Sequence, residues 1–157
     1  MKNVDLVRHR DSLCSVMERA KDLGQDPELL GHWGRYLCVL TAGFLESTIR
    51  ILYGSYAEKR AASSVATYVV AQLERIQNPK AGKFIEVARA FDQRWAHNLE
   101  AFLDENDERR RNAIDSIMNN RNLIAHGRSS SVSVVRVREY FTSISEVVDY
   151  LESQCES

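Results

Sequence analysis

The sequence contains few of the residues that interrupt regular structure or cross-link a chain. Two prolines and seven glycines among 157 residues argue against a loop-rich all-β fold and against disorder. Cys14, Cys38 and Cys155 are odd in number and form no CxxC pair, so we expect free thiols in a reducing compartment, the cytoplasm, and no disulfide framework. No apolar run approaches the ~18 residues of a membrane span, so we expect no membrane partner.

Motifs that mark several common enzyme classes are also absent. The sequence has no glycine-rich phosphate loop, no HExxH motif and no GxSxG motif. The Glu-x-x-His ligands of a di-iron helical bundle are missing too. Glu28 and His32 are four residues apart, but two ligands do not form a metal site, and we interpret this pair as a surface contact. The sequence therefore predicts neither a metal nor a cofactor.

Apolar residues recur at helical spacing along almost the whole chain, which predicts one all-α domain over residues 1–157. The stretch 27–58 is apolar on two faces, so we expect it to lie at the centre of the fold. We predict an antiparallel four-helix bundle with one or two accessory helices. The predicted helices span residues 3–21, 27–58, 63–77, a stretch carrying the apolar positions from 84 to 102, 107 to 125 or 126, and 134 to at least 151.

Several residues predict where these helices begin and end. Asp26 is placed as an N-cap with Pro27 at the first helical position, and Ser133 is placed as the N-cap of the last helix. The acidic tract DENDE, residues 104–108, is expected to close one helix and to open the next. Gly127 is well placed as a C-terminal cap.

Positive charge is concentrated in one segment, although the whole chain carries a net charge of −1. The segment 109–138 holds seven arginines and one aspartate, which give it a net charge of +6. Arg110 and Arg111 there are either part of a solvated face or guides for RNA. Arg128, together with the serines that follow it, is a further candidate for contacts with phosphate.

The stretch NNRNLIAHGRSSS, residues 119–131, carries the most specific pattern. Arg121 lies seven residues after Ile114 and four after Ile117, which places it on the apolar stripe of its own helix. A guanidinium on such a face must find an acceptor, because an unpaired buried charge is costly. Asn122 and His126 are four residues apart and share an adjoining face at the end of the helix. The pattern predicts that an arginine, an asparagine and a histidine converge there.

These three residue types suit the cleavage of a phosphodiester. Arginine offers a planar set of donors that matches phosphate, and histidine moves a proton near neutral pH. RNA carries its own nucleophile, the 2′-hydroxyl, so neither a metal nor an enzyme nucleophile is required. One histidine is not base and acid at the same instant, but a two-fold dimer would supply a second copy of His126 and of Arg121.

The segment RNLIAHG resembles the signature of the HEPN superfamily (higher eukaryotes and prokaryotes nucleotide-binding), and the RiboL-PSP-like branch is the nearest. AGFLESTIR in the second predicted helix is similar as well, because HEPN proteins often carry a glutamate there, here Glu46. The resemblance implies a four-helix bundle that dimerises with its motifs facing each other. It also implies that Arg121 and His126 are the catalytic pair, that Asn122 is their polar companion and that Glu46 fixes the arginine or the histidine. Glu46 could equally pair with Arg50, four residues on.

Three interpretations follow. Many members of the superfamily are metal-independent endoribonucleases of toxin–antitoxin or defence systems, and we expect this chain to be such an enzyme. Its expected substrate is RNA, and its expected partner is a second copy of the chain. An antitoxin or a regulatory protein is a possible further partner. The alternative is a non-catalytic HEPN module that binds nucleotide, RNA or protein. The third is a helical adaptor, in which Arg121 forms a structural ion pair and His126 caps its helix.

Overall fold

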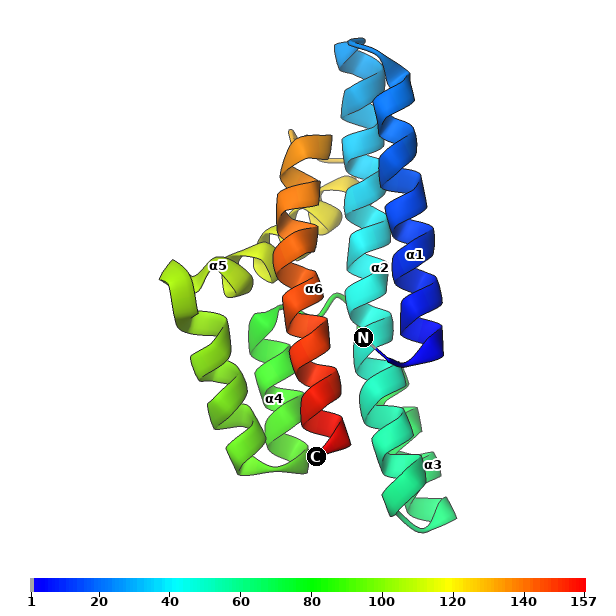
Figure 1. Cartoon of the computed structure of the whole chain (residues 1–157), viewed down its shortest axis with the longest axis vertical. Coiled ribbons are helices and arrows are strands. Elements are labelled where there is room, and N and C mark those ends of the chain that lie inside the picture. The colour runs from blue at the N-terminus through cyan, green and yellow to red at the C-terminus, as the bar shows by residue number, and fades with distance from the viewer. Residues whose placement is uncertain (1) are drawn as a thin grey trace.

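The computed structural model describes residues 2–157, and these contain helices and no strand. The predicted all-α fold is therefore confirmed (Figure 1). The elements are α1 (Val4–Arg19), the 3-10 helix η1 (Ala20–Leu23), α2 (Pro27–Arg60), α3 (Ser63–Glu74), α4 (Ala81–Phe91), α5 (Gln93–Ala125) and α6 (Val134–Glu156).

Helix α2 is the central element, as its two apolar faces predict. It packs against α1, α3, α5 and α6, and Leu37, Phe44 and Ile49 on it are fully buried. Figure 1 shows α1 and α6 on either side of α2, with α3 folded back along its C-terminal end. By length and composition, α2 is the only helix within residues 2–157 that could cross a membrane. However, 61% of its most apolar window is buried inside the structure. That burial is typical of the core helix of a folded domain.

The predicted N-caps are confirmed. The Asp26 side chain accepts a hydrogen bond from the Glu28 backbone N–H at 3.0 Å, and Pro27 opens α2. The Ser133 hydroxyl accepts one from the Arg136 N–H at 3.1 Å and fixes the start of α6. Each contact satisfies a backbone donor that a helix leaves unpaired at its N-terminus.

The prediction of one helix through positions 84–102 is wrong, because the chain reverses at Asp92. This residue is extended, with φ −155° and ψ 128°, and its side chain accepts from the Arg94 N–H at 2.7 Å as the N-cap of α5. Aspartate favours a cap over a helix interior because its side chain competes for backbone N–H groups. The break leaves the apolar spacing nearly unchanged, so the periodicity hides it. Phe91 and Trp95 stack across the reversal, with ring centroids 6.4 Å apart.

Helix α3 ends at Glu74, three residues before its predicted end. The N–H groups of Arg75 and Ile76 form tight bonds with the Gln72 and Leu73 carbonyls, and Asn78 then takes a φ of 50°. The helix therefore ends in a tighter turn with i to i−3 hydrogen bonds, before it reaches Pro79.

The acidic tract separates two helical halves of α5, as predicted. Asn106, Asp107 and Glu108 have φ values of 54°, 56° and 58°, which is left-handed backbone. The helix bends sharply there, and its second half then runs behind α6 towards α2 (Figure 1). Cys38 on α2 donates a hydrogen bond from its thiol to the Ile117 carbonyl at 3.4 Å, which joins this second half to the core.

A serine-rich loop, residues 128–133, links α5 to α6 and lies tightly on α2. The Ser130 hydroxyl donates to Oδ1 of Asn120 on α5 at 2.8 Å. Gly34 on α2 lies directly under the loop, and a Cβ added there would overlap the carbonyl oxygen of Val132. Only glycine permits so close an approach of the two backbones.

Candidate functional site at the end of α5

The candidate residues of the stretch 119–131 are positioned by a well-formed helix C-terminus. Gly127 has a φ of 66°, which favours glycine, and its N–H bonds to the Ile124 carbonyl at 3.1 Å. The N–H of Arg128 bonds to the Leu123 carbonyl at 2.8 Å. These two bonds form a Schellman motif, so the predicted C-cap is confirmed. The motif fixes where His126 leaves the helix and where Arg128 enters the loop.

His126, Asn122 and Arg128 share one open pocket. Its volume is about 340 Å³, and Asn119 and Leu123 complete its lining. The side chain of His126 is exposed and makes no hydrogen bond with any residue between 2 and 157. The imidazole is therefore accessible to a ligand or to water.

Arg121 joins this group through Asn122. Its Nη1 donates to Oδ1 of Asn122 at 3.5 Å, a long hydrogen bond. Arg121 is half-buried, as its place on the apolar stripe predicts, yet no carboxylate among the described residues lies within 4.0 Å of it. The neutral amide of Asn122 is therefore its only polar partner in this part of the chain, and its positive charge remains uncompensated.

The arginines at the motif differ in this respect from the other arginines of the positive segment. Arg121 and Arg128 are the two arginines between 109 and 138 with no carboxylate within 4.0 Å in the described part of the chain. The others are all paired: Arg109 and Arg110 with Glu146, Arg111 with Asp104, Arg136 with Glu139, and Arg138 with Glu18. The unpaired positive charge of the segment is thus concentrated at the end of α5.

Comparison with known protein families matches the chain to the family model RiboL-PSP-HEPN over residues 7–157. The chain belongs to the RiboL-PSP-HEPN family. This agrees with the branch that RNLIAHG resembles. Comparison with curated proteins found no match, and comparison with solved structures found none either.

Glu46 of this HEPN chain lies half-buried on α2 with both carboxylate oxygens occupied. Arg50 donates from Nη2 to Oε1 at 2.6 Å, which is the alternative pair that the sequence offered. The Asn78 N–H donates to Oε2 at 3.1 Å. Glu46 therefore ties α2 to the turn between α3 and α4, and no hydrogen bond or ion pair in residues 2–157 connects it to Arg121 or His126.

The two other arginines predicted to contact RNA lie at the bend of α5. Arg110 donates to Glu146 at 2.7 Å and to the Phe102 carbonyl at 2.9 Å, and its guanidinium lies 3.9 Å from the centroid of the Phe102 ring. Arg111 donates to Asp104 at 2.7 Å. Burial alone would raise the pKa of the Glu146 carboxyl, but the hydrogen bonds from Arg110 and Arg109 outweigh it and lower that pKa.

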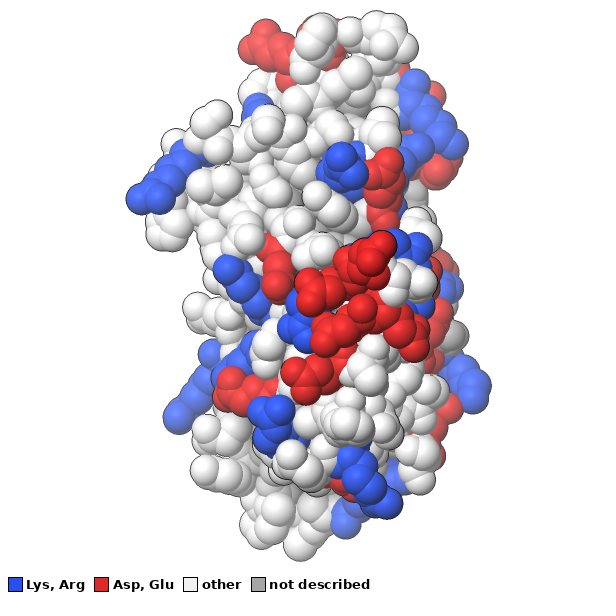
Figure 2. All heavy atoms as spheres, turned by 90° about the vertical axis from the view of Figure 1, so that its left-hand side faces the viewer, with Lys and Arg blue, Asp and Glu red and all other residues white. Residues whose placement is uncertain are grey.

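These contacts place Arg110 and Arg111 in intramolecular ion pairs. Figure 2 shows the surroundings: acidic side chains gather in a band across this face of the molecule, with basic side chains among them. An RNA backbone would be repelled by such a band, so the two arginines hold the bend together more readily than they would bind phosphate.

Three residues near the site escaped the sequence analysis. Asn119 and Leu123 line the pocket, and Asn120 anchors Ser130 of the loop. A signal for one of them was present, because Asn119 lies seven residues before His126 and three before Asn122, on the same face of the helix. The loop contact of Asn120 depends on the tertiary path of the chain and left no pattern in the sequence.

Proposed function

We propose that this HEPN protein is a metal-independent endoribonuclease of the cytoplasm that acts as a toxin or defence effector. One observation supports this most: Arg128, which has no carboxylate partner among the described residues, lines one pocket with the exposed His126 and with Asn122, and Asn122 accepts a hydrogen bond from the equally unpaired Arg121. An accessible imidazole beside unpaired guanidinium groups suits a phosphodiester.

The proposed reaction begins with the 2′-hydroxyl of the RNA. His126 takes the hydroxyl proton, the 2′ oxygen attacks the adjacent phosphorus, and the bond from phosphorus to the 5′ oxygen breaks. A proton from a second histidine or from water goes to the departing 5′ oxygen. Arg121 and Arg128 stabilise the negative charge that develops on the phosphate oxygens, and Asn122 orients Arg121. The products are a 2′,3′-cyclic phosphate and a 5′-hydroxyl.

The second histidine is proposed to be His126 of the partner subunit in a two-fold dimer. The exposed apolar side chains of Leu29, Tyr36 and Val39 on α2, with exposed fractions of 39%, 50% and 40%, support α2 as the surface of the proposed dimer. They are seven and three residues apart, so they lie along one face of the helix. Gly43, four residues on, is exposed and would add close-approach space, since a Cβ there meets no atom within 4 Å.

We expect His126→Ala and Arg121→Ala each to lower cleavage of a structured RNA by at least about 100-fold, the usual size of a lost acid–base or charge-stabilising group. The assay contains EDTA, and the product ends are analysed for the cyclic phosphate. Arg89→Ala removes an exposed arginine from α4 and is the matched control.

Helical circular dichroism should be unchanged in all three variants. Cleavage by His126→Ala at the parental rate would contradict the catalytic assignment. Retention of RNA by the parent protein without any cutting would favour the non-catalytic HEPN module. Growth arrest on expression that His126→Ala relieves would support the toxin role.

A further inference from the structure

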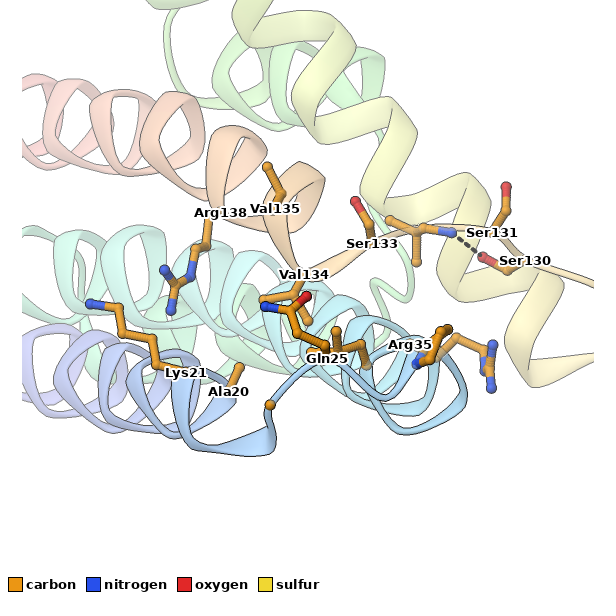
Figure 3. A pocket seen from close by; sticks show the side chains of 15 residues that line it. Ala20, Lys21, Gln25, Arg35, Ser130, Ser131, Ser133, Val134, Val135 and Arg138 are labelled. Atoms are coloured by element: carbon orange, nitrogen blue, oxygen red, sulfur yellow. Dashed lines mark hydrogen bonds between the residues drawn. The ribbon is translucent and has the colours of Figure 1, made fainter.

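A second, larger hollow lies on the other side of the serine-rich loop. Its volume is about 610 Å³, and it lies between η1, the first turns of α2, the loop and the start of α6 (Figure 3). We call it the loop groove. It is bordered by Lys21, Leu30, Arg35, Ser131, Val135 and Arg138, among others.

The charged groups that line the loop groove are all cationic: Lys21, Arg35 and Arg138. Figure 3 shows Lys21 and Arg138 extending towards each other at one end, while Arg35 lies at the other. The Glu18 carboxylate lies 2.6 Å from Nζ of Lys21 and 4.0 Å from Nη2 of Arg138, so a single carboxylate pairs with these two cations. A net positive charge therefore faces the groove.

The guanidinium of Arg138 is incompletely satisfied. Its Nη2 donates to the Met17 carbonyl at 2.6 Å, but its Nε is buried without a partner. A buried donor without a partner is unfavourable, so a small rotation towards an added acceptor would be favourable. Arg35 contacts Nδ1 of His32 through its Nη2 at 2.7 Å, and no carboxylate among the described residues lies within 4.0 Å of it.

The rest of the groove lining is mostly apolar. Leu30, Val132, Val134 and Val135 contribute aliphatic surface, and three serines add hydroxyl groups. Val135 is 68% exposed, so its side chain is accessible to a ligand in the groove. A ligand that combines a flat apolar body with a nearby negative charge fits this combination, and a nucleotide unit of a single strand has that chemistry.

The groove adjoins the pocket at His126 through the serine-rich loop. Arg128 lines the first hollow and Ser130 the second. The Cα atoms of these two residues are at most about 7 Å apart, because two residues of extended chain span no more. A strand whose phosphate lies at His126 therefore has the loop groove next to it.

We propose that the loop groove binds the nucleotide that neighbours the cleaved phosphate of an RNA strand, with its base on the aliphatic surface and its phosphate at Lys21 and Arg138. The groove thereby sets which bonds are presented for cutting. This inference rests on the proposed ribonuclease function, and its test is arranged to separate the two.

The test introduces either a negative or a positive charge at one exposed position of the groove. Val135→Glu places a carboxylate in the groove and Val135→Lys adds a cation, and neither removes a buried side chain. We expect Val135→Glu to weaken binding of an uncleavable 2′-O-methylated hexanucleotide roughly tenfold, and Val135→Lys to strengthen it. The matched pair is Val65→Glu and Val65→Lys on α3, where the valine is 52% exposed.

Equal responses at positions 135 and 65 would indicate bulk charge alone and would overturn the inference, as would no response at 135. Displacement of the hexanucleotide by AMP would make a free nucleotide the ligand and overturn the assignment to RNA. The proposed function is judged by a different result. If His126→Ala still cleaves at the parental rate, the catalytic assignment of His126 is contradicted whatever the Val135 pair does. If cleavage depends on His126 while both pairs behave alike, only the groove assignment is overturned.

Discussion

At the scale of single residues, the partners of an arginine decide what it can do. Arg110 and Arg111 are close in sequence to Arg121 and have the same chemistry, yet carboxylates from Glu146 and Asp104 neutralise them. Arg121 has only the amide of Asn122. The same type of side chain therefore braces the bend of α5 through ion pairs, whereas at the end of that helix it has no carboxylate partner among the described residues.

A single substitution distinguishes a structural role of Glu46 from a role in the candidate site. Both of its oxygens have partners in Arg50 and the Asn78 N–H. We therefore expect Glu46→Gln to leave kcat/KM within about threefold of the parent and to lower the free energy of unfolding by about 1 kcal/mol, the usual worth of such contacts. RNA cleavage and urea denaturation measure the two quantities. A loss of cleavage as large as that of Arg121→Ala, with unchanged stability, would instead place Glu46 in the site as the family resemblance implies.

At the scale of elements, the bend of α5 shapes the site because it directs the second half of that helix towards α2. Three consecutive residues without a glycine, Asn106, Asp107 and Glu108, take left-handed backbone there. Such conformations cost about 1–2 kcal/mol per residue. The ion pairs of Arg110 and Arg111 across the bend offset part of that cost.

We expect Asp107→Gly to be more stable than Asp107→Ala by about 1 kcal/mol, because glycine adopts a φ of 56° without steric penalty and alanine does not. Thermal or urea unfolding of the two variants provides the comparison. The sign is informative, since within a continuous helix alanine would be the more stable of the two by a similar amount. That reversed order would show that α5 is straight in solution.

Most of the helices could be predicted from the sequence because apolar periodicity and helix caps are local signals. Asp26, Ser133 and Gly127 each act on backbone groups within a few residues of themselves, and all three were predicted. The reversal at Asp92 was missed because one extended residue scarcely shifts the apolar spacing. The pairing of Arg110 with Glu146 spans 36 positions in the sequence, so no local pattern reveals it.

In the candidate site, too, some features follow from local spacing in the sequence and others depend on the packing of distant segments. The half-buried position of Arg121 follows from its distance to Ile114 and Ile117 along one helix. The shared face of Asn122 and His126 also follows from spacing, and the structure adds the pocket that they line with Arg128. Whether Arg121 has a carboxylate partner depends on how the other helices pack, which the sequence pattern did not determine.

At the scale of the whole molecule, the loop that carries Arg128 is positioned by a helix from the other half of the chain. Gly34 on α2 and the Val132 carbonyl are in close contact, so any side chain at position 34 must push the loop outward. The two hollows on either side of this loop, at His126 and at the loop groove, therefore depend on a single backbone-to-backbone approach.

We expect Gly34→Ala to lower the free energy of unfolding by about 1–3 kcal/mol, the usual cost of overpacking, and to reduce RNA cleavage as well. Gly82→Ala is the control, because a Cβ there meets no atom within 4 Å. Unfolding in urea and cleavage of RNA are measured for both. Parental stability and activity of Gly34→Ala would mean that the loop is not held against α2 in this way.

The close contact between Gly34 and the Val132 carbonyl has a practical consequence for mutational screens. If the protein is toxic when expressed, a saturation library scored by survival will rank position 34 alongside position 126, although one is intolerant because of space and the other because of proton transfer. Adding a second score, such as the abundance of soluble protein in the survivors, separates the two groups: Gly34 variants should be depleted from the cell, whereas His126 variants should accumulate.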